Sequence, residues 1–418
     1  MIVKKLKNGI TMVKYPIPEN KSVEIELYVR LSDDCEDKEG IAHFLEHMHY
    51  RQLGDMEQEQ LYEKLNKMGV ALQGKTYKDM MVFYIKARPQ FATQVLSIIS
   101  NLISTTNWTQ EQFELEKEVV LREIEEKNYS YNEHIVDKLI WKKSYLSRSI
   151  LGETSVVENL TLEEVIAYKK KVFSSDNICV TILGRYDDKE VESEIEKIAT
   201  IPLQNATEKI KKTGGSVQFK RKPDIKVTKY SSWSDIDVRI SFDVDKSKIK
   251  ENEVIFLSSI MAAGDGSVLM QEMRERRGLV YDIYSYAEEY ENNMLLSIEF
   301  CTDKENLTEC LKLIFDLTAN FSSILTQKDI DTNIVFFTDN LWYWEEEKHT
   351  LSFELGADFV HRKRLKTIEE RINDNQQMNV SRMREVADII FARENLSISV
   401  MGDTRSIRKK DIMSLLNN

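Results

Sequence analysis

Two stretches of this 418-residue chain share one pattern: "VFSSDNICVTILGRYD" at residues 172–187 and "IFARENLSISVMGDTR" at residues 390–405. In each, a Phe is followed four residues later by Asn, and then by an apolar run that ends at Gly. The landmarks of the two stretches are separated by a single offset of 218 residues: Phe173, Asn177 and Gly184, then Phe391, Asn395 and Gly402. An apolar run of this length predicts a buried strand. Its recurrence indicates one structural unit that occurs twice in tandem.

Other segments recur in the same order. Apolar and polar residues alternate in "SVEIELYVRL" from Ser22 and in "DIDVRISFDV" from Asp235, which predicts two half-buried strands. The segments "MMVFYIKARPQFATQVLSIISNLI" and "NMLLSIEFCTDKENLTECLKLIFDL" each read as a strand followed by a helix. Duplication of one strand-and-helix unit explains these matches together.

The segment between the two copies is rich in Lys, Gly and Pro and has no apolar period. We therefore expect an α+β protein of two similar domains, residues 1–210 and 222–418, joined by a linker at residues 211–221. Each domain should contain an antiparallel-rich sheet with helices packed on one face.

Composition narrows the classes of function. A net charge of −12 argues against nucleic acid as the main partner. No apolar run approaches the roughly 20 residues of a membrane helix, so we expect no membrane partner. The N-terminal residues lack the pattern of a secretory signal. The four cysteines are scattered without a close pair, which indicates free thiols and a cytoplasmic protein: Cys35, Cys179, Cys301 and Cys310.

The segment "GIAHFLEHMHY", which begins at Gly40, has the features of a metal site. On a helix, His43 and His47 lie on one face, where two imidazoles can bind one zinc ion. Glu46 lies about 100° around the helix, where it can act as a general base without being a ligand. The alternative is an amphipathic helix that carries histidines by chance. The order His-x-x-Glu-His, in a chain with six histidines, favours the metal. His49 should point away from this face and be exposed.

A catalytic zinc ion needs a third protein ligand. The segment "TQEQFELEKEVVLREIEEKN", residues 109–128, predicts a helix with an apolar stripe of Phe113, Val120 and Ile124. Composition does not choose among its acidic residues: Glu111, Glu114, Glu116, Glu118, Glu123, Glu125 and Glu126.

Taken together, these segments resemble the pitrilysin/insulinase metallopeptidases, the inverzincins. The chain is most similar to the short-chain branch that includes mitochondrial processing peptidase and its bacterial relatives. "GIAHFLEHMHY" resembles the zinc helix of the family, and "GVALQGKTYKDMMVFYIKA" its substrate strand. "FELEKEVVLREI" resembles the helix of the distal glutamate, and "VLMQEMRERRGLVYDIYS" a motif of the second half. The resemblance implies a zinc-dependent endopeptidase that cleaves unfolded peptides, with two similar α+β domains.

The resemblance also implies roles for individual residues. The ligands of one Zn²⁺ ion per chain would be His43, His47 and Glu114, with Glu46 as general base. Glu111 and Glu118, one turn away on the same helix, are the alternatives to Glu114.

Further residues would contact the substrate. Arg274 and Tyr281 match a pair that binds the substrate carbonyl and stabilises the oxyanion, for which a guanidinium and a phenol are suitable donors. Gln73, Gly74 and Thr76 lie in the segment that resembles the substrate strand. The family usually has Asn-Ala where this chain has Gln73-Gly74, which indicates an altered choice of substrate.

In the family, the Arg–Tyr pair and the zinc ion lie on opposite sides of a chamber that needs two short chains. We therefore expect a homodimer, or a heterodimer with a related chain, that acts on a peptide substrate. The competing hypothesis is a non-catalytic scaffold subunit of the same family.

Overall fold

The computed structural model describes residues 1–31, 38–127, 132–142, 144–205, 222–230 and 234–417. The chain forms two compact units. The first unit comprises Met1–Tyr129, Arg148–Gly215 and Trp342–Thr367, and the second comprises Ser130–Ser147, Ser216–Leu341 and Ile368–Asn418. The predicted linker at residues 211–221 lies outside the described residues.

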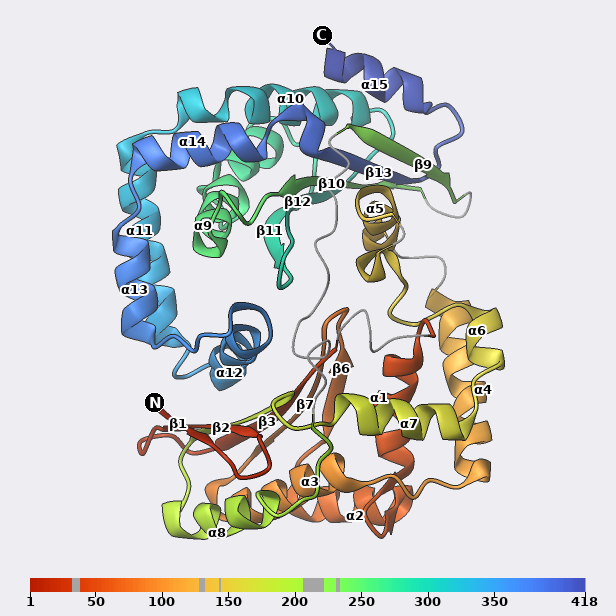
Figure 1. The fold of residues 1–418 in the computed structure, drawn as a ribbon. Coiled ribbons are helices and arrows are strands. Elements are labelled where there is room, and N and C mark those ends of the chain that lie inside the picture. Colours follow the sequence, from red (N-terminus) through yellow and green to blue (C-terminus); the bar gives the residue numbers. More distant parts are fainter. Residues whose placement is uncertain (32–37, 128–131, 143, 206–221, 231–233, 418) are drawn as a thin grey trace. The chain divides into compact units, whose positions relative to one another are not determined.

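The first unit is built on a six-stranded sheet with the order β1-β2-β8-β3-β7-β6 (Figure 1). All neighbouring strands are antiparallel except β2 and β8, which are parallel. A short hairpin, β4 and β5, lies apart from this sheet. The strands are β1 (Ile2–Lys5), β2 (Thr11–Pro16), β3 (Val23–Arg30), β4 (Gln52–Leu53), β5 (Met56–Glu57), β6 (Gln73–Thr76), β7 (Met80–Ala87) and β8 (Ile178–Gly184).

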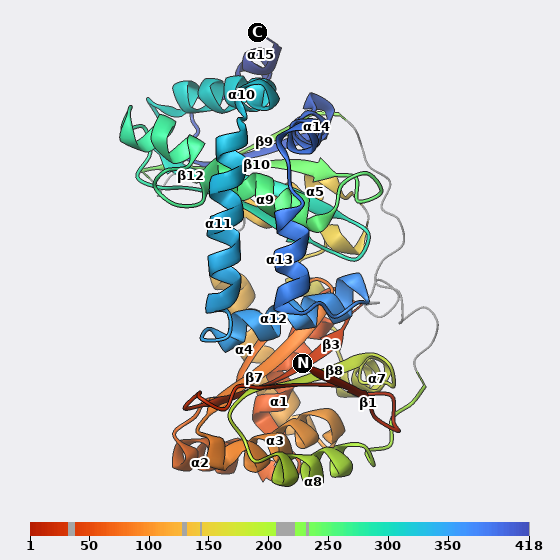
Figure 2. The same ribbon diagram turned by 90° about the vertical axis from the view of Figure 1, so that its left-hand side faces the viewer.

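Helices cover both faces of this sheet. Side chains of β3, β7 and β8 form one apolar core with several of the helices. The helix α12 packs on the other face against β3 and β8 (Figures 1 and 2). The helices are α1 (Ile41–Arg51), α2 (Gln58–Met68), α3 (Ala92–Ser104), α4 (Gln110–Lys127), α6 (Thr154–Glu158), α7 (Leu162–Val172), α8 (Asp188–Ile198) and α12 (Lys348–Ala357), with short turns η1 (Pro89–Phe91) and η4 (Asp358–Arg362).

The second unit contains a five-stranded sheet with the order β11-β12-β10-β13-β9. Its strands are β9 (Asp224–Lys229), β10 (Ile236–Val244), β11 (Ile283–Glu289), β12 (Met294–Thr302) and β13 (Leu396–Gly402). Its helices are α5 (Asn132–Ile140), α9 (Glu251–Ala262), α10 (Leu307–Ile324), α11 (Gln327–Tyr343, whose last two residues join the first unit), α13 (Ile368–Gln376), α14 (Val380–Ile390) and α15 (Lys409–Asn417), with short turns η2 (Tyr145–Ser147), η3 (Met270–Glu275) and η5 (Arg393–Asn395).

The two sheets repeat one topology. Five strands of the first sheet, β2-β8-β3-β7-β6, correspond in order and direction to β9-β13-β10-β12-β11 of the second. In both, a long central strand lies antiparallel to its two neighbours, and the sheet contains one parallel pair. The predicted α+β class and the predicted internal duplication are confirmed.

The Asn that recurs in each copy of the repeat forms hydrogen bonds with backbone carbonyl groups. The Asn177 side chain donates hydrogen bonds to the Val172 carbonyl (2.6 Å) and to the Arg30 carbonyl (2.8 Å). Asn395 donates in the same way to the carbonyls of Ile389 (2.8 Å) and Ile390 (3.1 Å). Each Asn thus satisfies carbonyl groups that the end of the preceding helix leaves without a partner.

The two glycines are required by close backbone approach. A Cβ atom on Gly184 would lie 2.3 Å from the Ser22 carbonyl oxygen, and one on Gly402 would lie 2.2 Å from that of Asp235. Both glycines also have positive φ angles, 107° and 131°. The same backbone contact is therefore present at the same place in each copy.

The units are not the contiguous ranges that the sequence predicted. Residues 130–147 belong to the second unit, and residues 342–367 to the first. The reason is that α5 packs on β9, β10 and β13, whereas α12 packs on β3 and β8. Each sheet therefore has helices on both faces, not on the one face that the sequence predicted, and the helix on its second face comes from the other half of the sequence.

The described helices include none with the length and apolar character needed to cross a membrane. Cys179 and Cys310 are buried free thiols, and Cys301 is an exposed one. Cys35 lies outside the described residues.

Gly356 tests how α12 is held against the sheet. A Cβ atom at this position would lie 2.2–2.6 Å from three ring atoms of Tyr28, which is completely buried. We expect Gly356→Ala to destabilise the protein by about 1–3 kcal/mol through overpacking, measured by urea or thermal unfolding. The control is Gly266→Ala, where a Cβ atom meets nothing within 4 Å and the change should stay within about 0.5 kcal/mol. Equal stability of the two variants would contradict this packing.

Candidate metal centre

The predicted histidine pair lies on α1, as expected. The ring centroids of His43 and His47 are 4.5 Å apart, one helical turn from each other. Phe44 of the same helix is fully buried and contacts Phe113 of α4 at a ring-centroid distance of 5.0 Å. This apolar contact brings α4 alongside α1.

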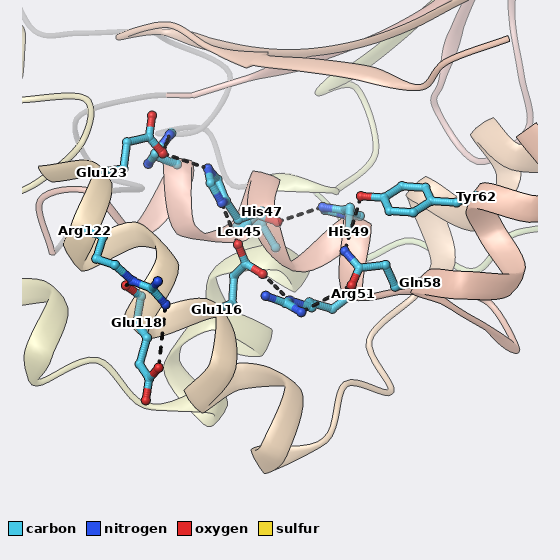
Figure 3. Close-up of polar contacts among 11 residues, drawn as sticks. Leu45, His47, His49, Arg51, Gln58, Tyr62, Glu116, Glu118, Arg122 and Glu123 are labelled. Carbon is cyan, nitrogen blue, oxygen red and sulfur yellow. Dashed lines mark hydrogen bonds and ion pairs between the residues drawn. The ribbon is translucent and has the colours of Figure 1, made fainter. Parts of the chain in front are cut away.

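Glu123 of α4 completes the cluster, and Figure 3 shows its carboxylate beside the His47 ring. Its Oε2 atom lies 3.4 Å from Nε2 of His47 and 3.8 Å from Nε2 of His43. One ligand atom from each of the three residues lies within 4.8 Å of the other two. Two ligands of a tetrahedral zinc ion are about 3.3–3.4 Å apart when each bond is about 2.0–2.1 Å. Two imidazole nitrogens and one carboxylate oxygen at these separations therefore fit zinc.

Glu114 does not join this cluster. Its side chain is about half exposed, accepts a hydrogen bond from Gln110 at 2.7 Å and lies 3.7 Å from Lys117. It lies nine positions before Glu123, a rise of about 13.5 Å and about two and a half turns, so the two point to opposite sides of α4. The alternatives are exposed as well: Glu111 faces solvent and Glu118 pairs with Arg122. The assignment of Glu114 as third ligand is not supported, and Glu123 takes its place.

Glu116 orients the imidazole of His47, a role that the sequence did not reveal. Its Oε1 atom lies 2.7 Å from Nδ1 of His47, and its other oxygen accepts a hydrogen bond from Arg51 (Figure 3). When Nδ1–H donates to this carboxylate, the lone pair of Nε2 faces His43 and Glu123. Burial raises the pKa of Glu116, but His47 and Arg51 lower it more, so this carboxylate stays ionised.

The same carboxylates act on the charge of His47. Burial lowers its pKa, but hydrogen bonds to Glu116 and Glu123 raise it more, to about 9. Without a cation, the imidazole is therefore protonated at neutral pH. A divalent ion bound between Nε2 and Glu123 would replace this proton.

Glu46 lies beside the cluster and is held by β6. Thr76 donates a hydrogen bond from Oγ1 to Oε2 of Glu46 at 2.6 Å. A Cβ atom on Gly74 would lie 2.8 Å from Oε1 of Glu46 and 2.6 Å from the Tyr50 hydroxyl. Gly74 thus allows the strand to approach the carboxylate, and Thr76 fixes how that carboxylate is turned. The side chain of Gln73 accepts a hydrogen bond from Tyr84 instead.

The expectation for His49 was wrong. This residue is completely buried, and its Nδ1–H donates to the Leu45 carbonyl at 2.8 Å. Its Nε2 accepts a hydrogen bond from Nζ of Lys169 at 2.7 Å, and Lys169 also donates to the Leu102 carbonyl. Burial and the neighbouring lysine lower the pKa of His49, so this imidazole is neutral and serves to anchor α1.

In the second unit, Arg274 and Tyr281 are neighbours. The guanidinium of Arg274, on the π-helical turn η3, lies 5.5 Å from the ring centroid of Tyr281. Tyr281 is 86% exposed, and Arg274 is also partly exposed, with Glu275 at 3.5 Å. A guanidinium and a phenol hydroxyl are therefore both accessible to a ligand of this unit.

The ligand assignment can be tested by metal analysis. We expect Glu123→Gln to lower the number of zinc ions bound per chain by one, because the neutral amide is a poor ligand. Glu114→Gln, a matched change on the same helix, should bind as much zinc as the wild type. Glu116→Gln should keep the site but weaken it by about 10–100-fold. Loss of zinc from Glu114→Gln with retention by Glu123→Gln would reverse the assignment.

Two family models match consecutive parts of this chain. The family model described as "Insulinase (Peptidase family M16)" matches residues 13–154, and that described as "Peptidase M16 inactive domain" matches residues 159–334. An "uncharacterized zinc protease" of Rickettsia bellii is 23% identical over 365 residues, which are 86% of this chain and 87% of that protein.

Two further relatives extend the comparison. The "mitochondrial-processing peptidase subunit beta" of Neurospora crassa is 25% identical over 229 residues, which are 52% of this chain and 46% of that protein. The crystal structure of a protease from Helicobacter pylori has a TM-score of 0.85 at 17% identity, covering 96% of this chain and 98% of that one, and so shares its fold. Together with the two matched domain models, these similarities show that the chain belongs to the M16 (insulinase) peptidase family.

Proposed function

We propose that this chain is a zinc-dependent endopeptidase that cleaves unfolded peptides in a chamber formed by two chains. The observation that carries the proposal is the convergence of His43, His47 and Glu123, with the buried carboxylate of Glu46 beside them. Three protein ligands leave a zinc ion one position for water or substrate, as catalytic zinc sites require.

The strand β6 supports a peptide as substrate. It is the last strand in the sheet order and pairs only with β7 among the described strands. An extended peptide can therefore add to its other edge through backbone hydrogen bonds. Because Gly74 and Thr76 of this strand contact Glu46, a peptide on this edge would run close to that carboxylate. Folded proteins offer few such extended segments, so unfolded peptides are the expected substrates.

Glu46 would carry the proton transfers. A zinc ion, when bound, supplies a Lewis acid and lowers the pKa of a coordinated water to about 7. Glu46 would take the proton of the attacking water and deliver it to the leaving amine. Its hydrogen bond from Thr76 keeps the carboxylate turned in one direction during both transfers. Arg274 and Tyr281 would bind the substrate carbonyl and stabilise the negative charge that develops there.

The chain carries both groups of residues that the reaction needs, so two identical chains could supply them to each other. We propose a homodimer in which Arg274 and Tyr281 of one chain serve the zinc centre of the other. A heterodimer is the alternative, since one relative is named a "subunit beta" of a processing peptidase.

A non-catalytic scaffold subunit is the second candidate. It is favoured by the name of the family model that matches residues 159–334, "Peptidase M16 inactive domain". That match covers Arg274 and Tyr281 but none of the residues of the metal cluster. We prefer the enzyme because the ligands, Glu46 and the partners Thr76 and Glu116 are all present together.

The variant Glu46→Gln tests the enzymatic role. It keeps the size of the side chain but removes the base, so we expect zinc binding to be unchanged and hydrolysis of a quenched peptide to fall about 10²–10⁴-fold. The zinc content of the variant is the control for folding. A variant that cleaves at the wild-type rate would show that Glu46 is not the base. A zinc-loaded wild type that cleaves no peptide would favour the scaffold.

Mixing two inactive variants tests the dimer. One chain carries Glu46→Gln, and the other carries Arg274→Ala with Tyr281→Phe. Random exchange of chains should restore about a quarter of the wild-type rate, because half of the dimers gain one intact site of two. If the mixture is no more active than the separate variants, each chain uses its own Arg–Tyr pair or the partner is a different protein.

A further inference from the structure

A second cluster of possible metal ligands lies on the other face of the first unit's sheet. Glu24 and Glu26 are two residues apart on β3, so both side chains point to the face that α12 covers. His349 of α12 places its Nδ1 atom 2.8 Å from Oε1 of Glu26 and 3.7 Å from Oε1 of Glu24. One ligand atom from each residue lies within 4.8 Å of the other two.

The carboxylate of Glu24 is the unusual member of this cluster. The residue is only 3% exposed, and the described residues donate no hydrogen bond to it. Among the described residues its ion pair is with His349, at 3.7 Å, which is too long for a hydrogen bond. An ionised carboxylate in such a place is costly unless a cation or a donor lies against it. The carboxylate of Glu24 therefore points into the cluster without a hydrogen-bond donor from the described residues.

The other two members are held in place by their neighbours. Glu26 is completely buried, and its Oε2 accepts a hydrogen bond from the Tyr28 hydroxyl, which also contacts Ser352 of α12 at 3.2 Å. Its Oε1 is the atom that faces His349. The ring of His349 stacks on Tyr84, with the centroids 4.4 Å apart. Contacts of this kind fix the direction of metal ligands.

The lysines around the cluster leave the negative charge of its two carboxylates unbalanced at close range. Lys86 is the cross-strand partner of Glu24 on β7, and Lys348 precedes His349. Both act on Glu24 through space, but among the described ion pairs neither comes within 4.0 Å of Glu24 or Glu26. A protonated His349 would balance one of the two carboxylates at close range. A divalent cation would balance both.

We propose that Glu24, Glu26 and His349 form a second metal site, which takes a divalent ion of the zinc type. Two carboxylate oxygens and one imidazole nitrogen are ligands that zinc accepts. His349 is half exposed, so an ion can enter from solvent. The bound ion would link β3 to α12 and so attach residues 342–367 to the first unit. This site is separate from the cluster on α1 and α4, and it does not depend on peptidase activity.

The test uses zinc alone as the probe. The double variant His43→Ala, His47→Ala removes the first centre; after chelator treatment, equilibration with zinc and gel filtration, we expect one zinc ion per chain. Adding Glu24→Gln and His349→Ala should remove this ion. Tyr84→Phe, which keeps the ring on His349, is the matched control in the same background and should retain the ion.

Thermal unfolding gives a second readout that needs no activity. Zinc should raise the melting temperature of the His43→Ala, His47→Ala chain, and it should have no effect once Glu24 and His349 are changed. If that combination fails to fold, His349→Ala alone, at a half-exposed position, serves the same purpose. The proposal is overturned if the His43→Ala, His47→Ala chain binds no zinc after gel filtration. It is also overturned if that chain binds zinc equally well once His349 is replaced by Ala.

Discussion

The contact between α1 and α4 is the feature on which the rest of the site depends. Phe44 and Phe113 set the distance between the two helices, and further along α4 the carboxylates of Glu116 and Glu123 lie on either side of the His47 ring. The two histidines are neighbours through local helix geometry alone. The third candidate ligand, Glu123, comes from a helix that begins almost 60 residues after α1 ends, so only the tertiary fold can bring it to the histidines. Each of these buried polar groups is costly by itself and acceptable only as part of the set.

The duplication shows which parts of the sequence carry the fold and which carry the chemistry. The helix α9 follows β10 as α1 follows β3, yet its sequence, ENEVIFLSSIMA, contains no histidine. The pairings of Val23 with Gly184 and of Ile236 with Gly402 make Glu26 and Arg239 equivalent positions of the two central strands. Both are completely buried, but their charges are opposite. The apolar alternation and the recurring Asn and Gly are shared by the two copies. The candidate functional side chains occupy positions where the two copies differ in sequence.

Much of the fold could be predicted because its signals are local. Alternation predicted β3 and β10, and the recurring Phe, Asn and Gly predicted the duplication. Glu123, the carboxylate that joins the histidine pair, was missed although a signal was present. The stripe of Phe113, Val120 and Ile124 marks the face of α4 that packs inward. Glu116 and Glu123 both lie on one side of this stripe, about 60–80° around the helix from Phe113. Glu114 lies about 100° from Phe113 on the other side.

Other features could not be read from the sequence. An amphipathic pattern shows that a helix buries one face, but it does not show which sheet the helix covers. The exchange of α5 and α12 between the two units could therefore not be predicted from the sequence, and neither could the burial of His49 against Lys169. Both depend on contacts between residues more than 80 positions apart in the chain.

We propose that α1 and α4 bind one metal ion through His43, His47 and Glu123. Crystals grown with zinc, and diffraction data collected on both sides of the zinc absorption edge, test it most directly. An anomalous peak about 2.0–2.2 Å from Nε2 of both histidines and from a carboxylate oxygen of Glu123 is the predicted result. No peak at this position, or a peak coordinated by Glu114 with Glu123 turned away, would contradict it.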